Sequence, residues 1–554
     1  MRKQTKLVAV LSAAALLAIG ASMTSFAAAA HWDQQDGEWV FVDRNGDRMT
    51  DVWKKSNGQW YYLDSDGYMA KDQVIEDDDN KYYVGADGAR VTNAWVSLDN
   101  DDLLDDDSEP ESIDTVWMYF DATGKALGAG VTNGEIKRLP YGDGKSDYFI
   151  FNDEGYMLSG WKRWSKKNGL DNDASDLYYL GSPNEGWART NWHYLEVNTD
   201  VNEFEGLDEE DNYTDESWFY FKSNGKAYVD TTASYNNRTY AFDKHGRMLD
   251  LWVYSQDAVI NSASDSNLTN NDASASSAKA AYYTEESGGR IGSDWILAYP
   301  SSNYDNYGDD LYYYYLDSKG KPFRANADAK LGGIGAAYRF DDDNAALTDV
   351  DTTSDVGAKI IKSQTYLFNK NGVMLTGLYY LGAETVDANG NPIDDAAKTV
   401  YRGKNAMSNG YYYFTEDDYP SSVAGQMVTN KRITIDVDGD DETYYFSKSG
   451  KAYQSTIIND YVYGTDGKLV TKGDGNTYEV VYLKDAGAKK VGDDKWVLYG
   501  KGNNNAEVLV SGDSKTQILI NGNGKIKKNG SVSKDLDDNK VTVSNYIVTK
   551  IETD

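Results

Sequence analysis

Residues 59–69 read QWYYLDSDGYM, an aromatic segment followed by a polar turn and a short returning segment. Aromatic side chains suit a pleated, half-buried strand. Asp and Ser bond their own backbone in turns, and Gly67 supplies the positive φ that a tight hairpin or its adjoining bulge requires. The segment therefore predicts one short β-hairpin, with a strand at 59–63 that returns after the turn at 64–67.

The same unit recurs at a fixed step. Gly46, Gly67 and Gly88 are 21 residues apart, and the aromatic residues around them keep this step. Polar turns that end in glycine return at irregular spacing at Gly124, Gly155, Gly225, Gly246, Gly320, Gly372, Gly450 and Gly467. A fixed period in this range is typical of repeat proteins. We therefore predict an all-β fold, a β-solenoid of stacked short β-hairpins with a divergent β-rich C-terminal region.

The first 30 residues predict a secretory signal peptide. Arg2, Lys3 and Lys6 give a basic start, an apolar run covers residues 7–20, and small residues suited to cleavage lie at 25–30. The apolar run is too short for a membrane span. The alternative is a retained N-terminal anchor, but the pattern favours an exported mature chain.

The composition excludes several kinds of site and partner. The chain has no cysteine, which excludes disulfides, thiolate metal sites and cysteine nucleophiles. A secreted chain without disulfides fits a bacterial surface protein. The formal net charge is −34, and loss of the three basic residues of the signal makes it −37. This charge argues against nucleic acid and anionic membrane as partners.

Acidic runs at 77–79, 99–111 and 341–343 separate the predicted hairpins. We interpret them as solvated insertion loops, with calcium binding as the alternative. Residues 436–440 read DVDGD, but Gly439 falls too early for an EF-hand loop. We therefore predict no metal site and no cofactor.

Changes in composition along the chain predict its organisation. Residues 256–281 are rich in Ser and Asn and predict a linker or an insertion. The last eighty or so residues form short aliphatic segments, which indicate either a capping unit or a small domain. The predicted parts are a signal peptide at 1–30, a first repeat array at 31–255, the linker at 256–281, a second, Tyr-rich array at 282–472 and the C-terminal region at 473–554.

Residues 59–69 closely resemble the choline-binding, or cell-wall-binding, repeat of Gram-positive surface proteins. Residues 148–161, which end in Gly160 and Trp161, resemble the same unit, and related repeats occur in glucan-binding proteins and clostridial toxins. The resemblance implies that aromatic side chains of adjoining hairpins form shallow cages for choline on teichoic acid, or platforms for the sugar rings of a polysaccharide such as glucan.

The resemblance also implies which residues bind the ligand. A quaternary ammonium cannot donate a hydrogen bond and is held by aromatic faces, at about 0.5–2 kcal/mol per favourable contact. The tryptophan repeat is not kept after Gly67, because Val74 and Lys81 stand one period after Trp53 and Trp60. Core packing is the alternative role for each ring. The candidates are Trp32, Trp39, Trp53, Trp60, Tyr62, Tyr83, Trp95, Trp161, Trp192, Trp218 and Trp252, so binding is expected mainly in the first array.

The sequence gives little support for an enzyme. Zinc amidases need closely placed His ligands, whereas His31, His193 and His245 are widely separated. With so few His and no Cys, the common nucleophile–base arrangements lack a base. The many Asp and Glu residues leave a two-carboxylate glycosidase open by composition, but such a site needs a walled cleft, whereas hairpin arrays give shallow grooves. We therefore predict no catalytic residues.

Three functions follow as hypotheses. The first is a secreted, non-catalytic protein that binds cell-wall polysaccharide or teichoic acid and is held at the wall without a covalent bond. Residues 548–554 carry no apolar tail for covalent sorting, which agrees with this hypothesis. The second is an adhesin for host glycans, and the third is a wall hydrolase with an unrecognised catalytic region.

Overall fold

The computed structural model describes residues 29–99, 115–142, 144–170, 175–196, 216–243, 245–250, 252–256, 259–262, 282–298, 311–325, 335–340, 354–370, 372–416, 424–437, 439–501 and 509–553. The chain divides into two compact units. Residues 1–265 with 286–289 form the first, and residues 266–285 with 290–554 form the second. The domain boundaries predicted from composition remain a prediction.

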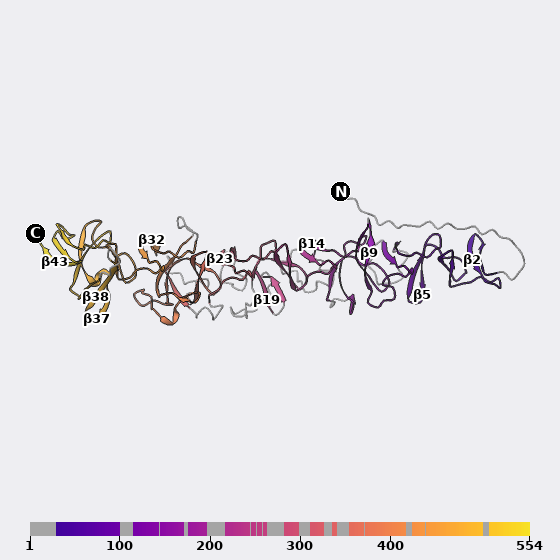
Figure 1. The fold of residues 1–554 in the computed structure, drawn as a ribbon, viewed down its shortest axis with the longest axis horizontal. Helices are drawn as coiled ribbons and strands as arrows, with labels where there is room; N and C mark the ends of the chain where they lie inside the picture. The colour runs from indigo at the N-terminus through magenta and orange to yellow at the C-terminus, as the bar shows by residue number, and fades with distance from the viewer. Residues whose placement is uncertain are drawn as a thin grey trace. The chain divides into compact units, whose positions relative to one another are not determined.

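The first unit consists of short strands that follow one another in chain order (Figure 1). They are β1 (His31–Gln35), β2 (Glu38–Val42), β3 (Val52–Ser56), β4 (Gln59–Leu63), β5 (Gln73–Asp77), β6 (Asn80–Val84), β7 (Ala94–Asp99), β8 (Thr115–Phe120), β9 (Glu135–Tyr141), β10 (Lys145–Phe151), β11 (Trp161–Ser165), β12 (Gly169–Leu170), β13 (Leu177–Tyr179), β14 (Asn191–Glu196), β15 (Glu216–Phe221), β16 (Thr231–Tyr235), β17 (Arg238–Phe242), β18 (Met248–Leu249), β19 (Trp252–Gln256) and β20 (Val259–Ser262).

Most of these strands pair antiparallel with the next strand of the chain. β3 pairs with β4, with Val52 opposite Leu63 and Trp53 opposite Tyr62. Asn57 and Gly58 join the two strands, with φ of 48° and 87°. Two successive positive φ angles define the type I′ turn, whose twist matches that of the flanking strands.

The strand predicted at 59–63 is confirmed as β4, but its partner differs from the prediction. The longer pairing runs back to β3 through the Asn57-Gly58 turn. The turn at 64–67 leads only to a single bridge between Leu63 and Met69. The tight Asn-Gly turn therefore determines the hairpin, and the Asp-to-Gly turn links one hairpin to the next.

The linking turns share one hydrogen-bond pattern, which Asp121 illustrates. Its Oδ1 accepts from the N–H groups of Thr123 at 2.7 Å and Lys125 at 3.0 Å, and also from the Thr123 hydroxyl. Partial burial raises the pKa of this carboxyl, but the hydrogen bonds outweigh that effect and leave the pKa below its ordinary value. The ionised carboxylate therefore stabilises the turn.

Replacing Asp121 with Ala should lower the free energy of unfolding by about 1–2 kcal/mol, because three donors lose their acceptor. Asp121→Asn should cost less, since Asn152 accepts from the Tyr156 N–H at 2.7 Å at the same turn position. Because the pKa of Asp121 is lower in the folded state, ionisation stabilises the fold above the unfolded pKa of about 3.9, and this stabilisation is lost as the pH falls. In urea unfolding, the difference in free energy of unfolding between the wild type and Asp121→Asn should therefore decrease below about pH 4. An unchanged advantage at lower pH would contradict this account of the turn.

Backbone hydrogen bonds join each hairpin to the one before it. The N–H of Met69, which follows the Gly67 turn, donates to the carbonyl of Trp39 in β2 at 2.7 Å. One period later, the N–H of Arg90 donates to the carbonyl of Trp60 in β4 at 2.8 Å. This bond places the side chain two residues after the turn glycine beside the aromatic rings of the preceding hairpin.

The interior of the first unit consists of rings that stack between successive hairpins. Phe120, Phe149, Phe151 and Phe219 are each 0% exposed. Phe149 and Phe151 pack with Trp95 and Trp117 in one cluster. The predicted all-β fold of stacked short hairpins is confirmed.

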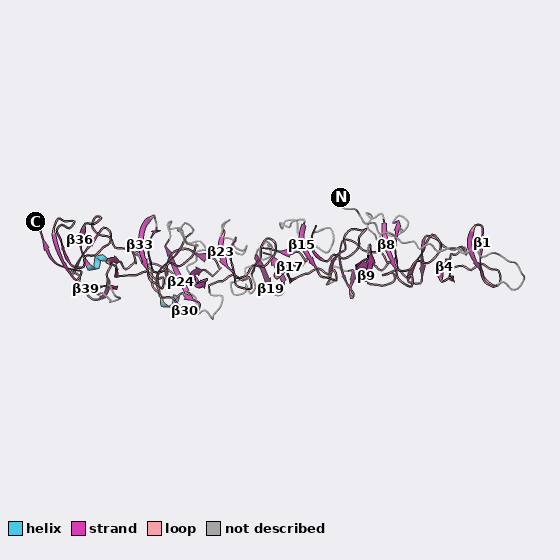
Figure 2. Ribbon diagram, turned by 45° about the horizontal axis from the view of Figure 1, so that its top comes forward, coloured by secondary structure: helices cyan, strands magenta, loops and turns pink. Residues whose placement is uncertain are grey.

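In its described residues, the second unit contains short strands and two brief helical turns, η6 (Ala396–Lys398) and η7 (Leu483–Ala486) (Figure 2). Its strands are β21 (Tyr282–Tyr283), β22 (Trp295–Ala298), β23 (Tyr312–Tyr315), β24 (Gly335–Phe340), β25 (Ser354–Ile361), β26 (Gln364–Phe368), β27 (Met374–Leu375), β28 (Gly377–Leu381), β29 (Tyr401–Arg402), β30 (Asn405–Ala406), β31 (Gly410–Phe414), β32 (Lys431–Val437), β33 (Asp440–Phe446), β34 (Thr456–Ile458), β35 (Tyr461–Tyr463), β36 (Tyr478–Tyr482), β37 (Lys489–Gly492), β38 (Lys495–Lys501), β39 (Val510–Gly512), β40 (Gln517–Asn521), β41 (Gly530–Val532), β42 (Lys540–Ser544) and β43 (Ile547–Glu552).

Two parts of the second unit depart from simple hairpins. Strands β24 to β31 form one eight-stranded sheet, in which β24 pairs with both β25 and β28. In the C-terminal region β38 pairs parallel with β34, whose residues precede that region. Ile457 of β34 also lies in one core cluster with Leu498 and Ile518. The C-terminal region is thus continuous in backbone bonding and core packing with the strands before it.

The expectations about acidic loops and membranes can be compared with the described residues. Across these residues, no group of three or more His, Asp or Glu side chains converges on a possible metal position. Asp436 Oδ1 accepts from the Gly439 N–H at 2.8 Å where β32 is followed by β33. The acidic stretches at 100–111 and 341–343 lie outside the described residues. None of the helices in the described ranges has the length and apolar character to cross a bilayer.

Candidate aromatic binding sites

The alternation of side chains along each strand gives every hairpin two aromatic faces. Trp53 and Tyr62 are cross-strand partners on one face, with ring centroids 5.1 Å apart. Tyr61 lies on the opposite face and meets Trp32 of the preceding hairpin at 5.5 Å. The space between the first two hairpins therefore receives Trp32 from the first hairpin and Tyr61 from the second.

The second cage of the chain shows this arrangement most completely. We give this name to Trp53 of β3, Trp60 of β4, Tyr82 of β6 and Arg90. Trp53 and Tyr82 meet edge to face, with centroids 5.2 Å apart. The guanidinium carbon of Arg90 lies 5.2 Å from the ring centroid of Trp53 and 5.3 Å from those of Trp60 and Tyr82. Three aromatic rings thus surround one cation.

We define the first cage by the same repeat positions one period earlier, which are Trp32 of β1, Trp39 of β2, Tyr61 of β4 and Met69. Trp32 and Tyr61 meet edge to face, as their counterparts do in the second cage. Met69 is 5% exposed and occupies the position of Arg90. This cage therefore has an uncharged thioether where the second has a guanidinium.

The third cage consists of Trp192 of β14, Trp218 of β15, Tyr240 of β17 and Met248 of β18. The centroid of Trp192 lies 4.8 Å from that of Tyr240 and 6.3 Å from that of Trp218, edge to face in both pairs. The Trp218 side chain is 45% exposed, so the cage has an open side. Met248 follows the turn glycine Gly246 by two residues, as Met69 follows Gly67.

A fourth cage occurs in the second unit and consists of Trp295 of β22, Tyr313 of β23, Tyr366 of β26 and Met374 of β27. Trp295 and Tyr366 have centroids 4.7 Å apart, and all four side chains belong to one cluster. A cavity of about 280 Å³ lies beside Tyr313 and Met374. The expectation that binding is concentrated in the first array did not include this cage.

The electrostatics of the first two cages favour a cation. The indole N–H of Trp53 donates to Asp77 Oδ2 at 3.1 Å. Burial, followed by the negative charge of Asp87, raises the pKa of Tyr61. Burial also raises the pKa of Tyr82, although Arg90 opposes that effect. The tyrosines therefore stay neutral, and their faces present the negative quadrupole that attracts a cation.

Two predicted tyrosines are not the tyrosines that close the first two cages. Tyr62 packs on Trp53 of the same hairpin, and both rings pack against Ile75 and Tyr82 of the next hairpin, so Tyr62 lies beside the second cage. The Tyr83 hydroxyl donates to Asp72 Oδ1 at 2.5 Å. The side chains that close the first two cages are instead Tyr61 and Tyr82, one residue earlier on each strand. The period-two alternation of a strand explains this shift by one residue.

Two predicted tryptophans are buried in the core. Trp95 is 8% exposed, and its indole N–H donates to the Pro140 carbonyl at 3.0 Å. Trp161 is 3% exposed, and its indole N–H donates to the Glu196 carbonyl at 3.1 Å. Trp252 begins β19, and its side chain lies outside the described part of the chain. The structure thus brings six of the predicted tryptophans into cages: Trp32, Trp39, Trp53, Trp60, Trp192 and Trp218.

The residues that the sequence reasoning missed share a simple signal. Tyr61, Tyr82, Met69 and Arg90 keep the step of 21 residues. The residue two positions after the turn glycine recurs as Met69, Arg90 and Met248. Extending the period from the tryptophans to these positions would have identified them.

Comparison with known proteins agrees with this repeat. The family model of the choline-binding repeat matches residues 49–95, which contain the whole second cage. The model of the putative cell wall binding repeat matches residues 212–227, which contain Trp218. No curated protein matches the chain.

Several solved structures from Streptococcus pneumoniae are similar. The modular autolysin LytC, solved with a synthetic peptidoglycan ligand, shares 17% identity over 63% of this chain and 52% of its own, with a TM-score of 0.31. The present chain thus spans about half of that autolysin. The choline-binding domain of CbpL shares 19% identity over 48% of this chain and 100% of its own, with a TM-score of 0.27. The choline-binding domain of Spr1274 shares 26% identity over 18% of this chain and 99% of its own, with a TM-score of 0.14.

The assignment rests on the two family models and on the register that repeats through the cages. The two matched segments contain Trp53, Trp60 and Trp218, which the sequence predicts as ligand-binding residues. The chain therefore carries repeats of the choline-binding and cell-wall-binding family, as its sequence predicts.

Proposed function

We propose that the chain is a secreted cell-surface protein that binds a cell-wall polymer, without catalytic activity and without a covalent link to the wall. The ligand is a quaternary ammonium group such as the choline of teichoic acid, bound in the first, third and fourth cages. The match to choline-binding repeats supports this proposal. The predicted signal peptide at residues 1–30 is consistent with export.

The third cage is the observation that carries the proposal. Trp192 meets both Trp218 and Tyr240 edge to face and stacks on Tyr220, and Met248 stands at the repeated position. Trp218 is 45% exposed, so a ligand attached to a polymer can enter from solvent. A quaternary ammonium needs aromatic faces and no hydrogen-bond acceptor, which is what these rings provide.

Several weak cages on one chain suit a polymer with repeated ligands. Once one cage has bound, the next choline is present at a high effective concentration, so total affinity exceeds that of a single cage. The net charge of −34 adds a general attraction for cations. Polymer binding therefore requires no deep pocket.

The proposal is tested by co-sedimentation of the full chain with purified choline-containing cell walls. We expect the chain to pellet with the walls, to be released by free choline, and to leave the turbidity of the wall suspension unchanged. Walls lacking choline and an insoluble glucan serve as controls. Binding to glucan alone would replace choline with a sugar ligand, and a steady fall in turbidity would show a wall hydrolase.

A further inference from the structure

The second cage differs from the first and third cages at one position. Arg90 stands two residues after the turn glycine Gly88, where the first and third cages have Met69 and Met248. Its backbone N–H donates to the Trp60 carbonyl at 2.8 Å, just as that of Met69 donates to Trp39 at 2.7 Å. The backbone is therefore the same in the first two cages, and the difference lies in the side chain.

The Arg90 side chain fills the space between the rings. Its guanidinium carbon is almost equidistant from Trp53, Trp60 and Tyr82, at 5.2 to 5.3 Å. A guanidinium stacks on aromatic faces and is more weakly hydrated than an ammonium, so it suits such a site. The distances fall within the 6 Å range of cation–π contacts, the same attraction that would hold choline.

Other contacts of Arg90 indicate that the rings are its main partners. Its Nε is buried without a hydrogen-bond partner, and within the described residues Arg90 forms no ion pair. From the next turn, Gly124 approaches so closely that an added Cβ would lie 2.8 Å from Arg90 Nε. Gly88 approaches Met69 of the first cage in the same way. The following hairpin thus holds the Arg90 side chain in place.

We propose that Arg90 is a built-in cation that occupies the second cage and excludes a quaternary ammonium ligand from it. Arg90 is a specificity-determining residue, because it decides which of two similar aromatic cages is open to a ligand. The inference rests on the proposed function, since it assigns choline to the cages with Met and denies it to the cage with Arg. The tethered guanidinium never leaves by diffusion, so it competes at a high effective concentration.

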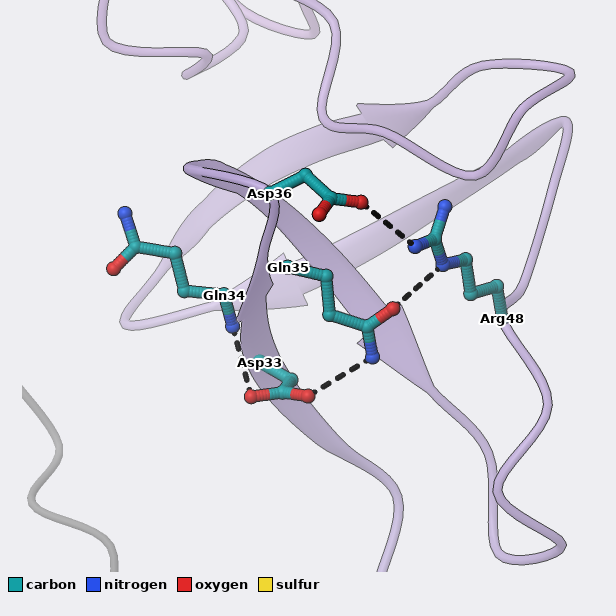
Figure 3. A network of polar contacts seen from close by, with 5 residues as sticks. All are labelled: Asp33, Gln34, Gln35, Asp36 and Arg48. Carbon is teal, nitrogen blue, oxygen red and sulfur yellow. Dashed lines mark hydrogen bonds and ion pairs between the residues drawn. The ribbon is translucent and has the colours of Figure 1, made fainter.

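Arg48 provides an internal comparison (Figure 3). It stands two residues after Gly46, at the same repeat position as Arg90. No hairpin precedes β1 in the described part of the chain, so no cage receives its side chain. Its Nε donates to Gln35 Oε1 at 2.7 Å, and its terminal nitrogen lies 4.0 Å from Asp36. Its guanidinium also lies 4.8 Å from the ring centroid of Tyr68. An arginine at this position that has no cage to enter thus contacts two polar side chains and one ring, whereas Arg90 contacts three rings.

The test uses the full chain labelled with 5-fluorotryptophan and titrated with choline, followed by ¹⁹F NMR. Trp32→Phe and Trp53→Phe assign one resonance to the first cage and one to the second. In the wild type we expect choline to shift the Trp32 resonance and leave the Trp53 resonance in place. In Arg90→Met the Trp53 resonance should shift as well, with an apparent affinity about tenfold or more above that of the wild type.

Two further variants control for indirect effects. Arg48→Met removes an arginine at the same repeat position and should leave both resonances as in the wild type. Arg90→Ala empties the second cage without supplying the Met side chain, and it should also make Trp53 responsive. The spectrum without choline shows whether each variant is folded.

The outcomes separate this inference from the proposed function. A Trp53 shift in the wild type equal to that of Trp32 would overturn the inference and leave choline binding intact. A silent Trp53 in both Arg90 variants, beside a responsive Trp32, would also overturn it. If no tryptophan responds in any variant, the proposed function fails, and the inference fails with it.

Discussion

Replacing Trp32, Trp192 and Trp295 together with Ala is expected to lower the affinity of the chain for choline-containing walls by roughly 10²–10⁴-fold. Each substitution removes one wall of an open cage, together with its cation–π contacts. The loss multiplies because bound cages raise the effective concentration of choline at the others. The three single variants should each show a much smaller loss. Co-sedimentation over a range of chain concentrations measures the effect.

The control for this variant is Trp187→Ala. Trp187 stacks on Tyr141 with centroids 4.6 Å apart and belongs to none of the four cages. Its removal should leave wall binding within about twofold of the wild type, because no quaternary ammonium contact is lost. An equal loss of wall affinity in this control would show that the effect of the triple variant comes from altered folding. Full binding by the triple variant would contradict the assignment of the cages.

Replacing Phe151 with Ala is expected to lower the free energy of unfolding by about 3–5 kcal/mol. The Phe151 side chain is 0% exposed, and its ring stacks on Trp95 with centroids 5.8 Å apart. Gly134 packs against the Phe151 backbone, where an added Cβ would lie 2.2 Å from its carbonyl oxygen. The neighbouring backbone is therefore fixed closely around this residue and leaves little room for the core to collapse into a cavity.

Urea unfolding of the full chain, followed by tryptophan fluorescence, measures this loss. Val131→Ala, at a residue that is 42% exposed, should change the free energy by no more than about 0.5 kcal/mol. Because neighbouring repeats stabilise one another, the Phe151 variant should also unfold in a broader transition. A loss below about 1 kcal/mol would show that the stacked rings do not form the core of the repeats.

The strands and the linking turns of the repeats could be predicted from residues 59–69, because aromatic residues and the Asp-to-Gly turn act over a few neighbours. The pairing of β3 with β4 was missed, although Asn57 and Gly58 form the strongest short-range hairpin signal. The linking turn at 64–67 also ends in glycine, so the sequence carries two turn signals, and only the Asn57-Gly58 signal closes a hairpin.

The cages were harder to predict than the fold. Which tyrosine closes a cage depends on the face of the strand, so Tyr61 and Tyr82 took the places expected of Tyr62 and Tyr83. Trp95 is covered because Pro140, from a different hairpin, reaches its indole N–H. The local spacing of residues in the sequence does not indicate such long-range contacts.

Arg90 shows the limit of reasoning from aromatic residues alone. The sequence places Trp53 and Trp60 in a complete repeat, and nothing in their own spacing distinguishes them from Trp32 and Trp39. The distinction comes from a non-aromatic position that the next hairpin supplies across a backbone hydrogen bond. A cage in this chain is therefore defined by four residues from two hairpins.

The measurement that tests the central claim most directly is the release of wall-bound full chain by choline and by 3,3-dimethylbutan-1-ol, its uncharged carbon isostere. The two molecules have nearly the same shape, but only choline carries the charge that aromatic faces attract. The account predicts that choline releases the chain at a concentration at least about tenfold lower than the isostere does. Equal release by both, or by neither, would contradict a cation-binding cage.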